Sequence, residues 1–173
     1  MQTKGFAEGS MKRMLFLVRH AKSSWDDAAL PDKERPLANR GKRDAPIMGK
    51  RLAKRQVRPD LILSSPARRA LSTAEIIAKE LNYRAKDIVV DDRLYATDAE
   101  TLLGVIGELS GKLKCVMLFG HNPEFTELAQ RLSNGSALMT TCAVAQLTFE
   151  STSWSSIGSR KPVEVLLDYP KNG

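Results

Sequence analysis

The sequence predicts an α/β protein of three layers, in which helices cover both faces of a mostly parallel, six-stranded sheet. Short apolar runs rich in β-branched residues alternate with segments whose apolar residues recur at helical spacing. No helical segment separates the last two apolar runs, so we expect those two strands to be antiparallel neighbours. The chain has 173 residues, of which 42% are hydrophobic, and this is enough for one domain with a substantial core.

Six segments have the length and composition of buried strands, namely residues 14–20, 60–65, 88–92, 114–120, 143–149 and 163–168. Four apolar stripes at helical spacing predict the helices. Their members are Ala45, Met48, Gly49, Leu52 and Ala53; Ala70, Thr73, Ala74, Ile77, Ala78 and Leu81; Phe125, Leu128, Ala129 and Leu132; and, in a shorter helix after Asp98, Leu102, Leu103, Ile106 and Leu109.

Three segments depart from this pattern. Pro46 lies within the first helical segment and lacks an amide proton, so we expect a kink or a late helix start there. Serine-rich residues 151–159 predict a hairpin or loop between the last two strands. Residues 1–13 show no periodicity and include a second methionine, Met11, so we expect a leader, a tag remnant or a frayed start, with residues 14–173 as a single domain.

The composition argues against several classes of protein. No apolar stretch approaches the roughly 18 residues of a membrane span, and the first ten residues lack the apolar centre of a secretion signal. We therefore expect a cytoplasmic protein with no membrane partner. Cys115 and Cys142 lie in or beside apolar runs, which favours small, reduced, buried thiols. Two histidines far apart, without a nearby acidic or cysteine cluster, supply too few ligands for a metal, so we expect no cofactor.

The net charge of +7 is compatible with an anionic partner or with a basic, solvated surface. The basic residues are spread along helical segments and are not interleaved with aromatic residues, so we do not expect nucleic-acid binding. The oligomeric state stays open at this stage.

Chemically distinctive residues follow three of the predicted strands. Arg19 and His20 end the first strand, residues 64–70 lead from the second strand into a helix with Arg68 and Arg69, and His121 follows the fourth strand. In an open α/β sheet, ligands bind at the carboxyl ends of the strands. Guanidinium groups, imidazoles and helix N-termini that meet there predict a site for a phosphoryl dianion.

Such a pocket also predicts a reaction. A neutral imidazole can attack phosphorus when a backbone acceptor holds its other ring nitrogen. Two guanidinium groups and a second imidazole can neutralise the charge on the phosphoryl oxygens. The product of this step is a phosphohistidine on His20, which water then hydrolyses.

Four ordered motifs resemble the histidine phosphatase superfamily, which has the phosphoglycerate-mutase-like fold. They are LVRHAK at residues 17–22, RPL at 35–37 with Gly41, LSSPARRA at 63–70 with TAE at 73–75, and FGHNP at 119–123. The chain is most similar to the SixA branch of phosphohistidine phosphatases, over about residues 14–149. The resemblance implies that His20 is the nucleophile, that Arg19 and Arg69 bind phosphoryl oxygens, and that His121 supports the transition state. Arg69 matches rather than Arg68, because it directly precedes the alanine of the motif.

Two departures from the wider superfamily are informative. Ala21 replaces the usual glycine after the nucleophile, which resembles the SixA branch. No inserted loop carries the usual general acid, for which Asp98 and Glu100 are the available candidates. An imidazole leaves with a reference pKa of about 6.5 and needs little protonation, whereas an alkoxide needs an acid. The missing acid therefore favours a nitrogen–phosphorus substrate, displayed on a protein because no cap encloses the site.

Several residues beside the motifs have two interpretations. Lys22 and Asn122 are candidates for substrate binding, but a solvated lysine and a helix-capping asparagine are equally compatible with the pattern. Asp26, Asp27 and Asp32 lie in the segment after the first strand, and we favour ordinary solvated acids for all three. Trp25 is either a docking aromatic or a cover for the edge of the core.

The leading hypothesis is a metal-independent phosphatase that hydrolyses phosphohistidine on a protein through a covalent phosphohistidine. The alternatives are the same chemistry on a small phosphomonoester and a phosphoprotein-binding module without turnover.

Overall fold

The computed structural model describes residues 12–173, and within them six strands form one sheet in the order β3-β2-β4-β1-β5-β6. The strands are β1 (Lys12–Arg19), β2 (Leu61–Ser64), β3 (Val89–Val90), β4 (Cys115–Gly120), β5 (Val144–Glu150) and β6 (Glu164–Asp168). The first four are mutually parallel, and β5 runs antiparallel to both β1 and β6. The predicted mostly parallel sheet and the antiparallel final pair are confirmed.

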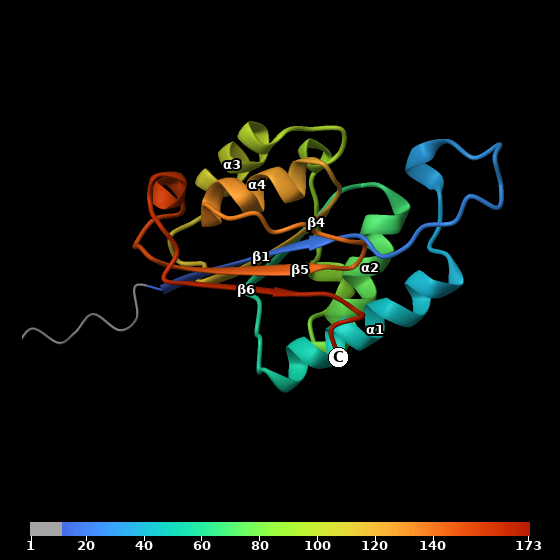
Figure 1. Cartoon of the computed structure of the whole chain (residues 1–173), viewed down its shortest axis with the longest axis horizontal. Coiled ribbons are helices and arrows are strands. Elements are labelled where there is room, and N and C mark those ends of the chain that lie inside the picture. The colour runs from blue at the N-terminus through green and yellow to red at the C-terminus, as the bar shows by residue number, and fades with distance from the viewer. Residues whose placement is uncertain (1–11) are drawn as a thin grey trace, which may run out of the picture.

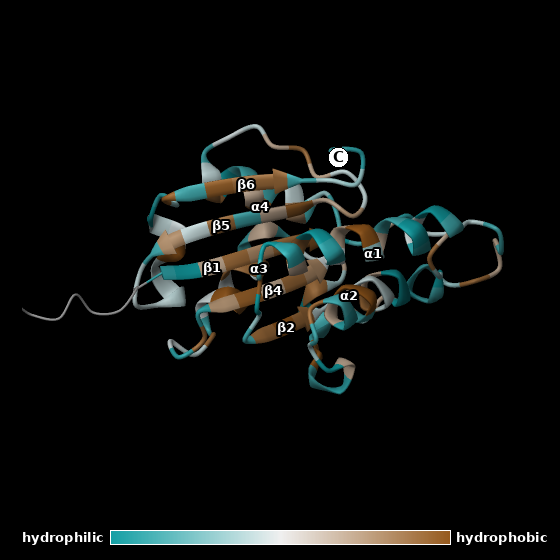
Figure 2. Cartoon of the chain, turned by 90° about the horizontal axis from the view of Figure 1, so that it is seen from below, coloured by the Kyte–Doolittle hydropathy of each residue, from teal (hydrophilic) through white to brown (hydrophobic). Residues whose placement is uncertain are grey.

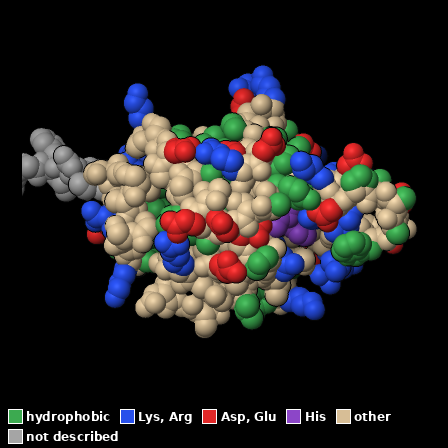
Figure 3. Space-filling model, turned by 90° about the horizontal axis from the view of Figure 1, so that it is seen from above, with side chains coloured by type: hydrophobic (Ala, Val, Ile, Leu, Met, Phe, Trp, Pro, Cys, Tyr) green, Lys and Arg blue, Asp and Glu red, His purple; other side chains and the backbone are tan. Residues whose placement is uncertain are grey.

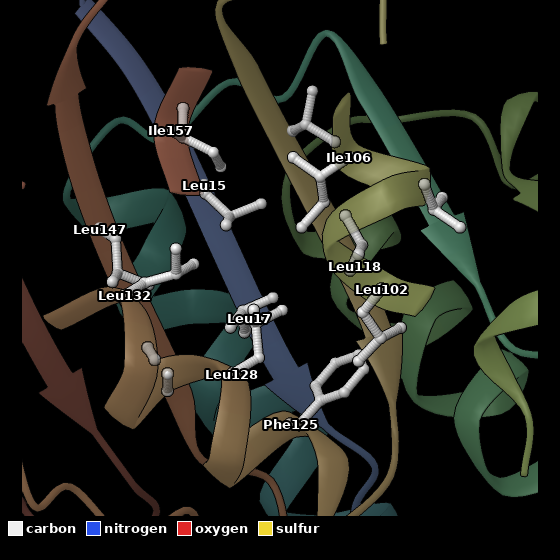
Figure 4. Close-up of a cluster of buried hydrophobic side chains, with 14 of the residues drawn as sticks. Leu15, Leu17, Leu102, Ile106, Leu118, Phe125, Leu128, Leu132, Leu147 and Ile157 are labelled. Atoms are coloured by element: carbon white, nitrogen blue, oxygen red, sulfur yellow. The ribbon is translucent and has the colours of Figure 1, made fainter. Parts of the chain in front are cut away.

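Helices lie on both faces of this sheet, with α3 (Ala99–Gly107) and α4 (Glu124–Ser133) on one side and α1 (Asn39–Lys54) and α2 (Arg68–Glu80) on the other (Figure 1). Successive side chains of a strand point to opposite faces, so a central strand supplies both cores. Leu15 and Leu17 of β1 join the cluster under α3 and α4 (Figure 4), whereas Phe16 and Val18 join the cluster under α1 and α2. The fold is therefore the predicted three-layer arrangement.

The hydropathy of each element follows its place in these layers. The central strands β1, β2 and β4 are mostly hydrophobic along their length, while the helices combine a hydrophobic side with a hydrophilic one (Figure 2). No helix among residues 12–173 has the length and apolar character to cross a membrane.

The strand register aligns the carboxyl ends of three neighbouring strands. Arg19 of β1 is paired with Gly120 of β4, and Ser64 of β2 is paired with Phe119 of β4. Residues that directly follow β1, β2 and β4 therefore meet at one edge of the sheet. The segment between β1 and α1 extends beyond this edge, at the right of Figure 1.

Some predicted boundaries were wrong. β1 begins at Lys12, two residues before the predicted start, because Arg13 is buried and its guanidinium donates to the carbonyls of Gly111 and Thr152. Lys12 and Arg13 thus belong to the sheet and not to a leader, while residues 1–11 of that predicted leader lie outside the described residues. Strand β3 has two residues instead of the five predicted.

Of the two outcomes predicted from Pro46, the late helix start is wrong, because α1 begins at Asn39 and contains Pro46, while the kink stays a prediction. Five buried residues of this helix pack inward, and that packing outweighs one missing hydrogen bond. Gly41 is required by a close approach, since a Cβ atom there would lie 2.3 Å from the backbone oxygen of Lys22.

The serine-rich segment forms a 3-10 helix, Trp154–Ser159, within the predicted connection. Trp154 and Ile157 are buried in the core under α3, and the indole of Trp154 donates to the carbonyl of Leu113. Both cysteines are free and buried, as predicted, and burial raises the pKa of each thiol to about 12.

Candidate active site

Four of the predicted site residues converge at the carboxyl ends of the strands. His20 follows β1, and His121 follows β4. Arg69 lies in the first turn of α2 and Arg19 ends β1, and both guanidinium groups are close enough to His20 to lower its pKa. The two imidazole centroids are 5.2 Å apart. The histidine side chains are visible in a recess among charged side chains of both signs (Figure 3). Both histidines and Arg69 are nevertheless more than nine-tenths buried.

Backbone geometry prepares His20 as a nucleophile. Its Nδ1 lies 2.7 Å from the carbonyl oxygen of Ala21, which can only accept a hydrogen bond. The proton therefore resides on Nδ1, and Nε2 keeps its lone pair. Burial lowers the pKa of His20 to about 4, and the nearby guanidinium groups of Arg69 and Arg19 add to this effect. The ring is consequently neutral, and nucleophilic, at physiological pH.

The loop that carries His20 is anchored to α2. The amide of Ala21 donates to the hydroxyl of Thr73 over 3.0 Å, and that hydroxyl donates to the carbonyl of Arg69 over 2.7 Å. One threonine thus connects the backbone of the segment that follows His20 to the backbone of Arg69. Sequence reasoning placed Thr73 in the apolar stripe of the helix and missed this contact.

The two arginines differ in how they are held. One terminal nitrogen of Arg19 donates to the carbonyl of Met139 over 3.0 Å, while its Nε is buried without a hydrogen-bond partner. Arg69 donates twice to Asp32, to the backbone oxygen over 2.7 Å and to Oδ2 over 2.9 Å. Both guanidinium groups therefore reach the site with their orientation set by backbone or carboxylate oxygens.

Asp32 is part of the site, which corrects the interpretation that it is an ordinary solvated acid. Its Oδ2 also accepts from the hydroxyl of Tyr95 over 2.7 Å, and its Oδ1 accepts from Arg35 over 3.1 Å. The Tyr95 hydroxyl, followed by Arg69 and Arg35, holds the pKa of Asp32 at about 2. An acid this strong is ionised at neutral pH, so Asp32 orients Arg69 and is unsuited to donating a proton to a leaving group.

Arg35, which belongs to the RPL motif, organises the loop after β1. It donates to the hydroxyl of Ser23 over 2.6 Å and to the carbonyl of Ser24 over 3.1 Å. Its guanidinium carbon lies 3.3 Å from the ring centroid of Trp25. Trp25 is 69% exposed, so it does not cover the edge of the core.

The second imidazole has one satisfied and one unsatisfied nitrogen. Nε2 of His121 lies 2.7 Å from the hydroxyl oxygen of Ser65, while Nδ1 is buried with no hydrogen-bond partner. The ring of Tyr95 packs edge-on against His121 at 5.5 Å between centroids. Burial, followed by His20 and Arg69, lowers the pKa of His121 to about 3. Sequence reasoning missed Ser65, Tyr95 and Asp32, because no local pattern marks a contact between segments far apart in the chain.

The remaining candidates lie outside this cluster or already have partners. Lys22 is exposed. The amide of Asn122 donates to the Met139 carbonyl, and its oxygen accepts from the amide and hydroxyl of Thr126, as in the helix-capping alternative. Asp98 caps the first turn of α3, and Glu100 pairs with Arg131. Among residues 12–173, no group of three or more His, Cys, Asp or Glu side chains is arranged to hold a metal ion.

The site thus combines a neutral imidazole, the buried guanidinium of Arg69, the partly buried guanidinium of Arg19 and a second imidazole with an unsatisfied nitrogen. Fold and site together define an α/β protein with two imidazoles and two arginines at the carboxyl ends of its parallel strands. A sequence model of the histidine phosphatase superfamily (branch 1) matches residues 15–108, more than half of the chain. The chain belongs to the histidine phosphatase superfamily, and its fold is the phosphoglycerate-mutase-like fold of that superfamily.

Known proteins resemble the chain over most of its length. An uncharacterized chloroplastic protein of Arabidopsis thaliana is 33% identical over 153 residues, which span 84% of this chain and 70% of the relative. The structure of the SixA protein of Agrobacterium tumefaciens matches with a TM-score of 0.76 and 28% identity, and it covers 89% of this chain and 97% of that one. A protein histidine phosphatase SixA complexed with tungstate matches with a TM-score of 0.79 and 24% identity over 92% and 98% of the two chains.

Proposed function

We propose that the protein is a metal-independent phosphatase that removes the phosphoryl group from phosphohistidine on a protein, through a phosphohistidine formed on His20. One observation carries the proposal: Nδ1 of His20 faces the Ala21 carbonyl, so the nucleophilic Nε2 is free beside Arg19 and Arg69. The likeness to SixA proteins supports the choice of substrate class.

The reaction takes two steps. The lone pair on Nε2 of His20 forms a bond to phosphorus, and the bond between phosphorus and the substrate nitrogen breaks with its electron pair going to the departing imidazole. That imidazole takes its proton from solvent. In the second step, water attacks the phosphorus on His20, the new nitrogen–phosphorus bond breaks, and the lone pair returns to Nε2 as phosphate leaves.

The ionised state of Asp32 supports a nitrogen–phosphorus substrate over a phosphate ester. Asp32 is the carboxylate that is hydrogen-bonded to Arg69, and its pKa of about 2 leaves it without a proton to donate at neutral pH. An alkoxide leaving group needs such a proton, whereas an imidazole has a reference pKa of about 6.5 and leaves more easily.

The test is dephosphorylation of a phosphohistidine-bearing protein, run beside a panel of sugar phosphates and with a chelator present throughout. We expect release of phosphate from the phosphoprotein, little release from the sugar phosphates, and no effect of the chelator. Transient transfer of radiolabelled phosphoryl to the enzyme should be lost in His20→Ala. Preferred hydrolysis of the sugar phosphates would favour a phosphomonoesterase, and tight phosphoprotein binding without turnover would favour a binding module.

A further inference from the structure

The two nitrogens of the His121 ring lie in different surroundings. Nε2 is 2.7 Å from Oγ of Ser65, whereas Nδ1 is buried and has no hydrogen-bond partner. Buried polar atoms nearly always have a hydrogen-bond partner. The unpaired Nδ1 of His121 therefore indicates that a bound group supplies the missing contact. The ring stands 5.2 Å from that of His20, which places a phosphoryl group on His20 beside it.

The hydrogen bonds of Ser65 decide which nitrogen of His121 carries the proton. Its hydroxyl oxygen already accepts from the amide of Ala67 over 3.1 Å. A serine hydroxyl has one proton to donate, and among the described contacts of this oxygen the acceptor for it is Nε2 of His121. If Nε2 carried the proton instead, the serine proton would be left without an acceptor inside a fully buried site.

We propose that Ser65 is a positioning residue that holds His121 in the tautomer with its proton on Nδ1, so that this nitrogen donates a hydrogen bond to a phosphoryl oxygen. The opposite tautomer would present a lone pair to an anion and would repel it. In the site without a bound anion the buried ring is neutral, with a pKa of about 3, so its tautomer decides which nitrogen an incoming phosphoryl group meets. The inference rests on the proposed function in naming a phosphoryl group as the acceptor.

The chain supplies a matched control one residue away. Ser64 is as fully buried as Ser65, but its hydroxyl donates to the carbonyl of Ser65 over 2.9 Å. Ser65→Ala and Ser64→Ala therefore remove the same atom from adjacent positions, and only the first change removes the partner of His121.

The direct test is the ¹⁵N spectrum of the histidine side chains in the untagged, full-length protein. The chain has two histidines, and His20→Asn leaves one, so the signals of His121 are assigned unambiguously. We expect protonation at Nδ1 in the wild type and in Ser64→Ala, and a mixture of tautomers in Ser65→Ala. Protonation of His121 at Nε2 in the wild type would overturn the proposal, even if Ser65→Ala fails to fold.

A binding and a kinetic readout complete the test. Tungstate should move the Nδ1 signal of His121 in the wild type, and Ser65→Ala should bind tungstate more weakly than Ser64→Ala does. Loss of an oxyanion donor lowers kcat about 100-fold to 1,000-fold. Since part of the ring population keeps the productive tautomer, we expect a fall of about tenfold or more for Ser65→Ala, with a smaller change in KM. Equal kinetics of the two alanine variants would contradict the proposal.

These readouts separate the inference from the proposed function. If the wild type has no phosphatase activity but the tautomer and the tungstate response are as expected, the proposed function fails and the role of Ser65 stands. If the wild type is an active phosphatase but His121 carries its proton on Nε2, the proposed function stands and the role of Ser65 fails.

Discussion

Lowering the pH from 7 to 5 should destabilise the protein mainly through its two buried histidines, His20 and His121. Burial holds the pKa of His20 at about 4 and that of His121 at about 3, below the ordinary value of 6.5. In this window the unfolded chain takes up protons that the folded protein does not, so stability falls as the pH falls. Each ring accounts for about 2 kcal/mol between pH 7 and pH 5, and the pair for about 4 kcal/mol.

The assay is urea unfolding at pH 7, 6 and 5 for the wild type and for His20→Asn and His121→Asn, in buffers free of phosphate because an anion would favour the charged rings. Each variant should lose about 2 kcal/mol less than the wild type between pH 7 and pH 5. Asp32 does not interfere, because its lowered pKa removes stability only below about pH 4. Burial raises the pKa of Glu124, so this group favours the folded protein as the pH falls, opposite to the effect of the histidines. Its contribution is the same in all three proteins and cancels when they are compared. An identical loss in all three proteins would show that the two rings are not the source of the pH dependence.

Three further predictions concern the surroundings of His20. Asp32→Asn removes the negative charge that is paired with the guanidinium of Arg69, so inorganic phosphate should inhibit the variant at several-fold lower concentration than the wild type. Unchanged or weaker inhibition would mean that the Asp32 carboxylate does not oppose anion binding. Gly41→Ala should lower the free energy of unfolding in a urea titration by about 1–3 kcal/mol, because the new methyl group would collide with the backbone oxygen of Lys22. Gly104→Ala is the control: open space surrounds this position, so the change should be neutral or stabilising. Trp25→Ala tests whether the exposed indole in the loop after β1 docks a protein substrate. KM should rise for a phosphohistidine protein and stay unchanged for free phosphohistidine. An equal effect on both substrates would argue against a docking role.

Much of the fold was predictable because its signals are local and repeated. The alternation of apolar runs with helical stripes predicted all six strands and the four helices, and boundary errors arose where single residues depart from the pattern. Arg13 is charged yet buried in β1, and Pro46 lies inside α1, because tertiary packing outweighed the local preference in both places.

The order of residues is sufficient to predict which chemical groups arrive at the ends of the strands. His20 and His121 each follow an apolar run after one intervening residue, and a parallel sheet brings the ends of such runs to the same edge. The orientation and the protonation of those groups depend on the packing of the folded chain and could not be predicted from the order of residues. The contacts of Asp32 with Arg69 and Tyr95, and of Ser65 with His121, join segments that are distant along the chain. Hydrogen bonds between polar side chains depend on the paths of loops to within a fraction of an ångström, and no periodic pattern in the sequence records those paths.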